Sequence, residues 1–305
     1  MWCPEIKEAQ MHFIPPTLSR RLAKTGAAFA LSAGMIWAQP AVELPRASPM
    51  ASISQTFGYT TATVAYSRPA VNGRVIWGSL VPYGMVWRAG ANEATVLELT
   101  TDARLNGKAL PKGKYGLFIL PTERDWTFIL SKTTKAWGSF TYDPKDDALR
   151  ITVAPQPAEH LERLEYGFEN LSDSGATLVT HWEKLKASID IRVEFLETGK
   201  AKIKEGLPKA KPDDPFAYMN AARFYWTYNI DRKQALEWID KSIQIKPVHN
   251  NLWAKAEMLA SDKKLQDAKK FAKQARDAAA KNPADAGAVA MIDKTVATWG
   301  ETGKK

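Results

Sequence analysis

Residues 104–131 read RLNGKALPKGKYGLFILPTERDWTFILS, a stretch typical of short antiparallel strands. Asn106 and Gly107 form the pair favoured in two-residue hairpin turns, because both central positions of such a turn need a positive φ angle. Residues 115–120 and 126–131 are short apolar and aromatic runs, and turn-forming residues precede each of them. This part of the chain is therefore expected to form a β-sheet.

The same pattern extends outward from this stretch, over about residues 48–195. Apolar residues recur with a period of two, which indicates strands that each bury one face. The expected strands are residues 61–67, 93–101, 115–120, 126–131, 149–154, 162–171, 176–182 and 188–195. Eight to ten strands without intervening helices favour an antiparallel β-sandwich or jelly roll. A closed barrel is the alternative.

The composition changes after Phe195. Residues 197–215 contain five Lys, three Pro and two Gly, which is typical of a solvated linker or a short helix. We therefore expect a β-domain over residues 48–195 and a linker over residues 196–215.

Residues 216–305 have the apolar spacing of helices. Asp213 or Asp214 can cap the first helix, with Pro215 at its first position. Ala235 and Ala268 lie 33 residues apart in equivalent helical stretches. This spacing resembles that of two tetratricopeptide repeats, without the full consensus. The expected fold class is therefore mainly β plus α, with a small helical repeat region that packs on the β-domain or on a partner.

The N-terminus reads as an export signal over residues 1–39. Arg20, Arg21 and Lys24 precede a 13-residue apolar run that ends at Ala38, which is too short to span a bilayer. Cleavage near Ala38 predicts a periplasmic or extracellular protein. The Arg pair partly resembles a twin-arginine signal, and an uncleaved N-terminal anchor helix is the alternative.

The charge is unevenly distributed along the chain. The whole sequence has 42 basic and 33 acidic residues, a formal net charge of +9. Residues 40–195 hold 17 of each sign, whereas residues 196–305 hold 21 basic and 14 acidic residues. The β-domain is therefore neutral, and any electrostatic partner is expected on the helical tail.

The densest group of polar and aromatic residues lies in residues 66–95, between expected strands. Arg and aromatic side chains recognise carboxylates, phosphates and sugars by forked hydrogen bonds and stacking. Gly and Pro in the same stretch impose unusual backbone geometry. The candidate ligand-binding residues are Arg68, Arg74, Trp77, Tyr83, Trp87, Arg88, Asn92 and Glu93.

The segments YSRPAVNGRVIWGSLVPYGMVWRAGANEAT (66–95), NGKALPKGKYGLFILP (106–121) and DWTFILSK (125–132) resemble a known family. It is a family of exported bacterial proteins described as domain of unknown function 2911. The resemblance covers about residues 48–195, and the helical tail lies outside it. It implies no reaction, and no catalytic residue can be transferred.

Two interpretations of residues 66–95 stay open. In the first, a concave polar pocket rimmed by Tyr83 and Trp87 binds a small anionic or hydroxylated ligand. In the second, Arg88 and Glu93 form a buried ion pair that only fixes a long loop, and Asn92 bonds to exposed backbone groups. The favoured function is non-catalytic ligand binding or protein interaction. The alternative is an enzyme in which Glu93 is the acid or base and the three arginines hold the substrate.

The sequence offers no recognisable metal or nucleophile site. His160, His181 and His249 lack the spacing of metal ligands, so no metal and no cofactor are expected. Residues 143–147 could supply oxygens to calcium, but they lack a calcium-loop pattern. Whether the protein is an enzyme is left open.

The partner is expected to be a small molecule or a protein. Nucleic acid fits neither export nor the absence of an aromatic strand platform with basic neighbours. Lysines of the tail alternate with Asp and Ala at helical spacing, as on a solvated helix face. That face is the candidate for contact with a membrane surface or an acidic partner.

Overall fold

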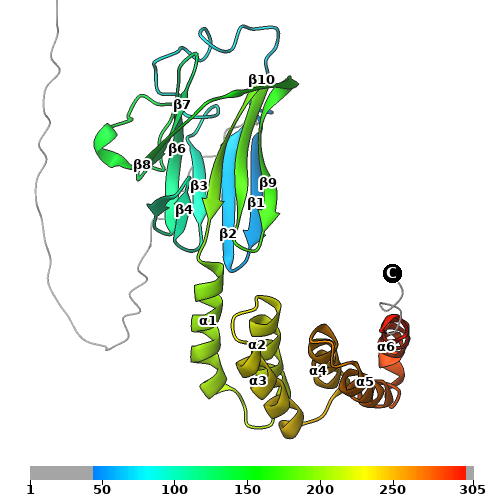
Figure 1. Ribbon diagram of the computed structural model, residues 1–305. Helices are drawn as coiled ribbons and strands as arrows, with labels where there is room; N and C mark the ends of the chain where they lie inside the picture. The colour runs from blue at the N-terminus through cyan, green and yellow to red at the C-terminus, as the bar shows by residue number, and fades with distance from the viewer. Residues whose placement is uncertain (1–43, 300–305) are drawn as a thin grey trace, which may run out of the picture. The chain divides into compact units, whose positions relative to one another are not determined.

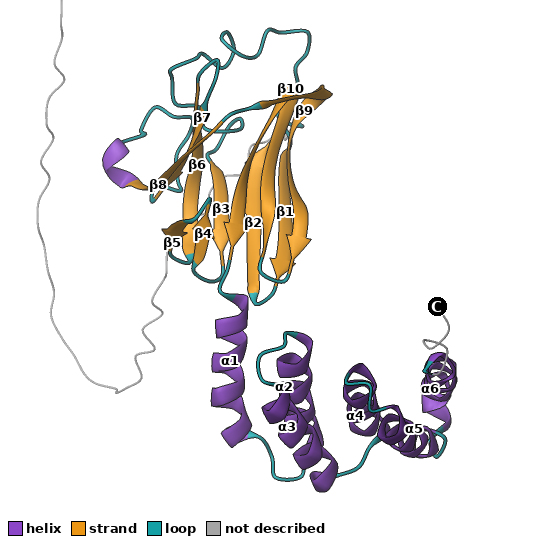
Figure 2. Ribbon diagram, in the orientation of Figure 1, coloured by secondary structure: helices purple, strands orange, loops and turns teal. Residues whose placement is uncertain are grey.

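Within residues 44–299, ten strands are followed along the chain by six α-helices (Figure 1). The computed structural model describes residues 44–299. The strands are β1 (Met50–Phe57), β2 (Thr60–Ser67), β3 (Thr95–Leu99), β4 (Ala103–Leu105), β5 (Lys108–Leu110), β6 (Gly113–Pro121), β7 (Trp126–Ser131), β8 (Asp147–Val153), β9 (Gln156–Ser172) and β10 (Gly175–Arg192). The helices are α1 (Phe195–Gly206), α2 (Pro215–Thr227), α3 (Arg232–Ile245), α4 (His249–Ser261), α5 (Leu265–Ala279) and α6 (Ala286–Thr298). The predicted mixed class, β followed by α, is confirmed (Figure 2).

The strands form two antiparallel sheets. One has six strands in the order β1-β2-β3-β6-β7-β8, and the other has four in the order β5-β4-β10-β9. Inward side chains of both sheets share one core, to which the first sheet contributes Leu97 and Leu117 and the second Leu178 and Ile189. Because the described strands form two separate sheets facing one core, the fold is a sandwich and not a closed barrel.

The alternation that indicated strands is visible in their burial. Residues of β2 and β3 alternate between buried and half-buried, as expected for strands with one face in the core. The turn between β4 and β5 has positive φ at both Asn106 (45°) and Gly107 (81°), which confirms the hairpin predicted from this pair.

The sequence pattern missed or divided some strands. β10 is one 18-residue strand where two were expected, because its pairing with β9 is irregular around Glu183, which has a φ of 55°. β1 was missed, because it lies at the sheet edge and its inward residues, which include Ala51 and Gln55, are mostly half-buried and weakly apolar.

A loop covers the outer face of the central strands. Phe118 and Ile129 point away from the main core and are buried in a second cluster. Ala136 and Tyr142, from the loop between β7 and β8, pack against this cluster together with Val86. Segments 84–88 and 132–146 therefore form an outer layer over β6 and β7.

The helices pack in sequential pairs. α2 packs on α3 and α4 packs on α5, around two small cores that include Ile239 and Trp253. The Asp214 carboxylate accepts the N–H of Phe216 at 2.8 Å, and Pro215 is the first residue of α2, as the sequence predicted. The expected linker over residues 196–215 contains α1 and a short 3-10 turn, Leu207–Lys209.

Aromatic residues connect the first helices to the sandwich. Phe195 stacks on Tyr59 with ring centroids 5.5 Å apart, and it also contacts Phe224 of α2 and Tyr228, which caps the end of α2. The Tyr228 hydroxyl donates a hydrogen bond to Asp173, in the turn between β9 and β10, at 2.6 Å. Within residues 44–299, no helix is both long enough and apolar enough to cross a membrane. The expected export signal lies outside the described residues.

Candidate functional site

Residues 68–94 connect β2 to β3 in the six-stranded sheet and contact β9 of the other sheet on the way. Pro69 and Val71 bond to the backbone of β9, through Leu164 N–H to Pro69 O (3.0 Å) and Val71 N–H to Glu162 O (2.7 Å). Trp87 then pairs with Ile119 of β6 by two hydrogen bonds of 2.8 Å. The segment is therefore held at both ends by sheet backbone, and its side chains have fixed directions.

Arg68 and Arg74 are occupied by their own surroundings. Arg68 donates from Nε to the carbonyl of Leu164 at 2.9 Å and forms an ion pair with Glu165 at 3.0 Å. Arg74 donates to the carbonyls of Val71 and Ala70, at 3.0 and 2.5 Å. Arg68 therefore attaches the segment to β9, and Arg74 satisfies carbonyls of the segment itself.

Trp77 and Trp87 lie in a cluster of four tryptophans. Trp126 of β7 and Trp182 of β10 complete it, with ring centroids 4.3 to 6.0 Å apart. Trp126 and Trp182 are 1% and 2% exposed, whereas Trp77 and Trp87 are half-buried. The Trp87 N–H donates to the carbonyl of Gly90 at 3.0 Å. The cluster fills one end of the sandwich core.

The other three indole N–H groups, of Trp77, Trp126 and Trp182, are buried without a hydrogen-bond acceptor among the described residues. Trp77 meets Trp87 and Trp182 at interplanar angles of 82° and 79°. Edge-to-face indole pairs bring the positive ring edge towards the negative face of a neighbour, a favourable arrangement. The cluster is thus accounted for as packing.

Tyr83, Asn92 and Glu93 lie at the surface of the same segment. Tyr83 is 36% exposed, and Asn92, at a φ of 58°, donates from its amide to the carbonyl of Ser48 at 3.1 Å. Glu93 accepts hydrogen bonds from Arg46 at 2.7 and 2.9 Å. This partner lowers the pKa of Glu93, so its carboxylate is ionised at neutral pH. No ion pair joins Glu93 to Arg88 within residues 44–299.

Arg88 differs from the other arginines of the segment. Its Nε is buried without a hydrogen-bond partner, and its guanidinium forms no hydrogen bond or ion pair in the part of the chain that the structure describes. Burial lowers the pKa of Arg88, although an arginine stays charged at any physiological pH. The side chain of Arg88 is therefore a partly desolvated positive charge without a counter-charge.

The environment of Arg88 belongs to the outer layer. A Cβ atom placed on Gly138 would lie 3.3 Å from Arg88 Nη1 and 2.8 Å from the Phe140 ring. Gly138 has a φ of 74°, and the neighbouring Trp137 and Phe140 are 62% and 87% exposed. The guanidinium thus lies beside a tight turn that carries two exposed aromatic rings.

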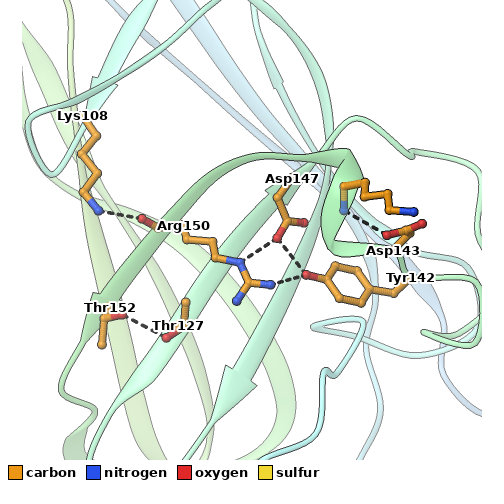
Figure 3. A network of polar contacts seen from close by, with 8 residues as sticks. Lys108, Thr127, Tyr142, Asp143, Asp147, Arg150 and Thr152 are labelled. Carbon is orange, nitrogen blue, oxygen red and sulfur yellow. Dashed lines mark hydrogen bonds and ion pairs between the residues drawn. The ribbon is translucent and has the colours of Figure 1, made fainter.

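Figure 3 shows the contacts that anchor this loop. Asp147 Oδ2 accepts hydrogen bonds from the Tyr142 hydroxyl at 2.8 Å and from Arg150 Nε at 2.6 Å. Arg150 Nη2 also donates to the Tyr142 oxygen at 2.5 Å. Lys108, from the other sheet, donates to the Arg150 carbonyl at 2.9 Å. These bonds fix the end of the loop that carries Trp137 and Phe140.

A second polar group fixes the backbone on the other side of Arg88. Ala89 has a φ of 53°, a strained conformation for a residue with a side chain. Its buried carbonyl accepts hydrogen bonds from the Tyr166 hydroxyl at 2.8 Å and the Thr95 hydroxyl at 3.0 Å. These two bonds hold the turn that sends Trp87 into the core and Arg88 to the outer layer.

Other candidate ligands of metals have protein partners. His181 contacts the carbonyl of Glu159 at 2.8 Å, and His249 lies 3.4 Å from Asp285. Asp143 caps a 3-10 turn, and Asp146 accepts a hydrogen bond from Thr133. No group of three or more His, Cys, Asp or Glu residues that could hold a metal ion occurs in residues 44–299.

The structure therefore divides the candidate residues between separate roles. Trp77 and Trp87 meet in the core, Arg68 and Arg74 bond to the chain itself, and Arg88 points to the outer layer. The sequence did not identify Trp126, Trp182 and Arg46 as partners of these candidate residues. The period-two pattern could have indicated that Trp126 and Trp182 point inward, whereas no pattern connects Arg46 with Glu93.

Comparison with known families gives one finding. Residues 48–191 match the model of a family described as protein of unknown function (DUF2911). The match covers the sandwich and ends before α1. Comparisons with curated proteins and with solved structures find no match.

Proposed function

We propose that the protein is an exported, non-catalytic binding protein in which Arg88 captures an anionic group. One observation carries this proposal. Of the three arginines in residues 66–95, only Arg88 has no hydrogen-bond or ion-pair partner among the described residues. A desolvated guanidinium without a counter-charge costs free energy, which an incoming carboxylate or phosphate would recover.

The surroundings of Arg88 suggest the kind of anion. The guanidinium lies next to Gly138, on an anchored loop whose neighbouring Trp137 and Phe140 rings are largely exposed. Exposed aromatic rings beside an arginine favour an anion that also has an apolar or aromatic part. Such a group can belong to a small molecule or to a side chain of a partner protein.

The enzyme alternative depends on Glu93 and is less well supported. A general acid needs a pKa near the working pH, whereas the hydrogen bonds from Arg46 lower the pKa of Glu93. Arg68 and Arg74 are also bonded to the chain and are not available to hold a substrate. Binding without catalysis is therefore the better proposal.

Export and the role of the helices complete the proposal. Residues 1–39 are proposed to direct the chain to the periplasm or the extracellular space and to be removed near Ala38. The β-domain would span residues 48–195, with a linker over 196–215. Residues 216–305 would form a tetratricopeptide-like region that faces a partner protein, with its excess of basic residues towards an acidic or membrane surface.

Thermal shift measurements on the full chain test the role of Arg88. The probes are inorganic phosphate, succinate, benzoate and phenyl phosphate, with benzyl alcohol as the uncharged comparison. We expect an aromatic anion to raise the melting temperature of the wild type and of Arg124→Met, but not of Arg88→Met. Arg124 is the matched control because it is an exposed arginine on the same domain.

Two results would contradict the proposal. One is that no anion stabilises the wild type, and the other is that Arg88→Met responds as the wild type does. If Arg88→Lys keeps only part of the shift, the planar guanidinium is required as well as the charge.

A further inference from the structure

We propose that a cavity at the opposite end of the strands from the tryptophan cluster binds a neutral polyhydroxylated ligand of the saccharide class. The cavity has a volume of about 420 Å³ and lies where the strand connections meet the start of α1. Such a volume lies within the usual range of small-molecule sites, about 300 to 1,000 Å³. None of its lining residues belongs to the Arg88 site.

Hydroxyl groups form a large part of the lining. Thr60, Thr100, Thr101 and Thr198 all border the cavity, and the hydroxyls of Thr60 and Thr101 bond to each other at 2.5 Å. Thr100 Oγ1 accepts the backbone N–H of Thr61 at 2.8 Å, so its own proton is available to another acceptor. A hydroxyl can both donate and accept, which is the property needed to bond the hydroxyl groups of a sugar.

The charges that line the cavity balance each other. Asp102 accepts the backbone N–H of Lys112 through Oδ1 at 2.8 Å, which leaves Oδ2 without a partner among the described residues. The Lys112 ammonium also has no ion-pair partner within residues 44–299. Glu194 lies 3.7 Å from Arg104, which offsets its charge. One free carboxylate oxygen and one free ammonium group favour a neutral ligand that can donate to the first and accept from the second.

An aromatic wall provides the apolar side of the site. Tyr59 and Phe195 both border the cavity and stack with an interplanar angle of 22°. Sugars present C–H groups as well as hydroxyls, and an aromatic wall beside polar groups matches both. A strongly charged ligand would pack poorly against the aromatic wall. Its charge would also be repelled by Asp102 or by Lys112.

Titration calorimetry on the full chain tests this proposal. The probes are glucose, galactose, N-acetylglucosamine, maltose and lactose, with free lysine and glutamate as charged comparisons. We expect at least one neutral sugar to bind the wild type. Asp102→Asn and Lys112→Met should each lower the affinity for that sugar about tenfold, because each removes one hydrogen bond to a charged group.

Control variants separate this site from the rest of the protein. Asp102→Asn keeps an oxygen for the Lys112 N–H, so its melting temperature should stay close to that of the wild type. Lys145→Met, an exposed lysine outside the cavity, and Arg88→Met should bind the sugar as the wild type does. Loss of anion binding in Arg88→Met with sugar binding kept would show that the two sites are independent.

The proposal would be overturned by any of three outcomes. These are no binding of any sugar, unchanged sugar binding in both Asp102→Asn and Lys112→Met, or binding of free lysine or glutamate in place of the sugars.

Discussion

The Arg46 guanidinium donates two hydrogen bonds to the Glu93 carboxylate, with Nη1 2.7 Å from Oε1 and 2.9 Å from Oε2. The pair joins the chain before β1 to the segment that precedes β3. Both side chains are exposed, at 53% and 40%, so solvent screens their attraction. Arg46 and Glu93 therefore form an exposed ion pair and not a buried one.

This pairing predicts a small, pH-dependent effect of Glu93→Gln. Exposed ion pairs contribute about 0.2 to 1 kcal/mol, so the variant should be destabilised by no more than this at pH 7. The pKa of Glu93 is lowered in the folded state, mainly by the hydrogen bonds from Arg46. Its contribution is therefore present above the ordinary carboxyl pKa and is lost as the pH falls through the lowered value.

Melting temperatures of the wild type and Glu93→Gln between pH 2 and pH 8 measure this effect. Glu123→Gln is the control for the loss of one exposed carboxylate, because Glu123 has no ion pair among the described residues. A large loss of stability at pH 7 would mean that the pair is buried in solution.

Tyr166 and Thr95 are predicted to act together on Ala89. Each hydroxyl donates to the buried carbonyl of Ala89, and either bond alone leaves that carbonyl satisfied. Tyr166→Phe and Thr95→Val should each lower the free energy of unfolding by about 0.5 to 1.5 kcal/mol. The double variant should cost more than their sum, because the carbonyl then lacks a partner within the described chain.

Urea denaturation of the four proteins of this cycle gives the coupling free energy. Additive losses would show that the Ala89 carbonyl finds another donor, such as water. Because Ala89 directs Arg88, the double variant should also lose the response to anions in the thermal shift experiment.

Much of the fold could be predicted, because it depends on local pattern. The alternation in residues 60–67 and 95–99 and the Asn106-Gly107 turn indicate strands directly, since each signal involves only neighbours along the chain. The cap at Asp214 is local in the same way. Edge strand β1 escaped detection, because its inward positions are mostly half-buried and include Ala51 and Gln55, which give only a weak apolar signal.

The candidate site could be predicted only as a region. Arg68 and Arg88 look equivalent in sequence, but the carbonyl of Leu164 and the carboxylate of Glu165 come within reach of Arg68 alone. Glu93 meets Arg46 across 47 residues of chain. Such partners depend on how the two sheets and the loop between β7 and β8 come together, which no pattern within the segment encodes.

Gly58 is predicted to be intolerant of a side chain. A Cβ atom at this position would lie 2.5 Å from the Asp173 carbonyl oxygen and 2.7 Å from the Phe195 ring, and its φ is 54°. Gly58→Ala should therefore lower the free energy of unfolding by more than the cost of strained backbone alone, which is about 1 to 3 kcal/mol. Gly73→Ala is the matched control, because its φ is 67° and nothing lies within 4 Å of its added Cβ.

The two alanine variants are compared by thermal denaturation. The difference between them measures the contact of the β1–β2 turn with Asp173 and Phe195. Equal losses would show that the turn can move away from these two groups at no cost.

Tyr228 is predicted to make the attachment of α2 sensitive to alkaline pH. The hydrogen bond to Asp173 is the main cause that raises the pKa of Tyr228 from 10.0 to about 12. The folded state therefore holds this proton more tightly than the unfolded state does. The contribution of Tyr228 to stability is complete below pH 10 and is lost as the pH rises through 12.

Absorbance titration of tyrosinate and denaturation between pH 8 and pH 12 test this prediction, with Tyr228→Phe beside the wild type. Tyr218→Phe is the control, because Tyr218 lies on α2, the helix that Tyr228 caps, and its hydroxyl forms no hydrogen bond among the described residues. Tyr228→Phe should flatten the alkaline loss of stability and remove one late-titrating tyrosine, whereas Tyr218→Phe should do neither. If the tyrosine that Tyr228→Phe removes is instead one that titrates near the ordinary value of 10.0, the Tyr228 hydroxyl does not bond to Asp173 in solution.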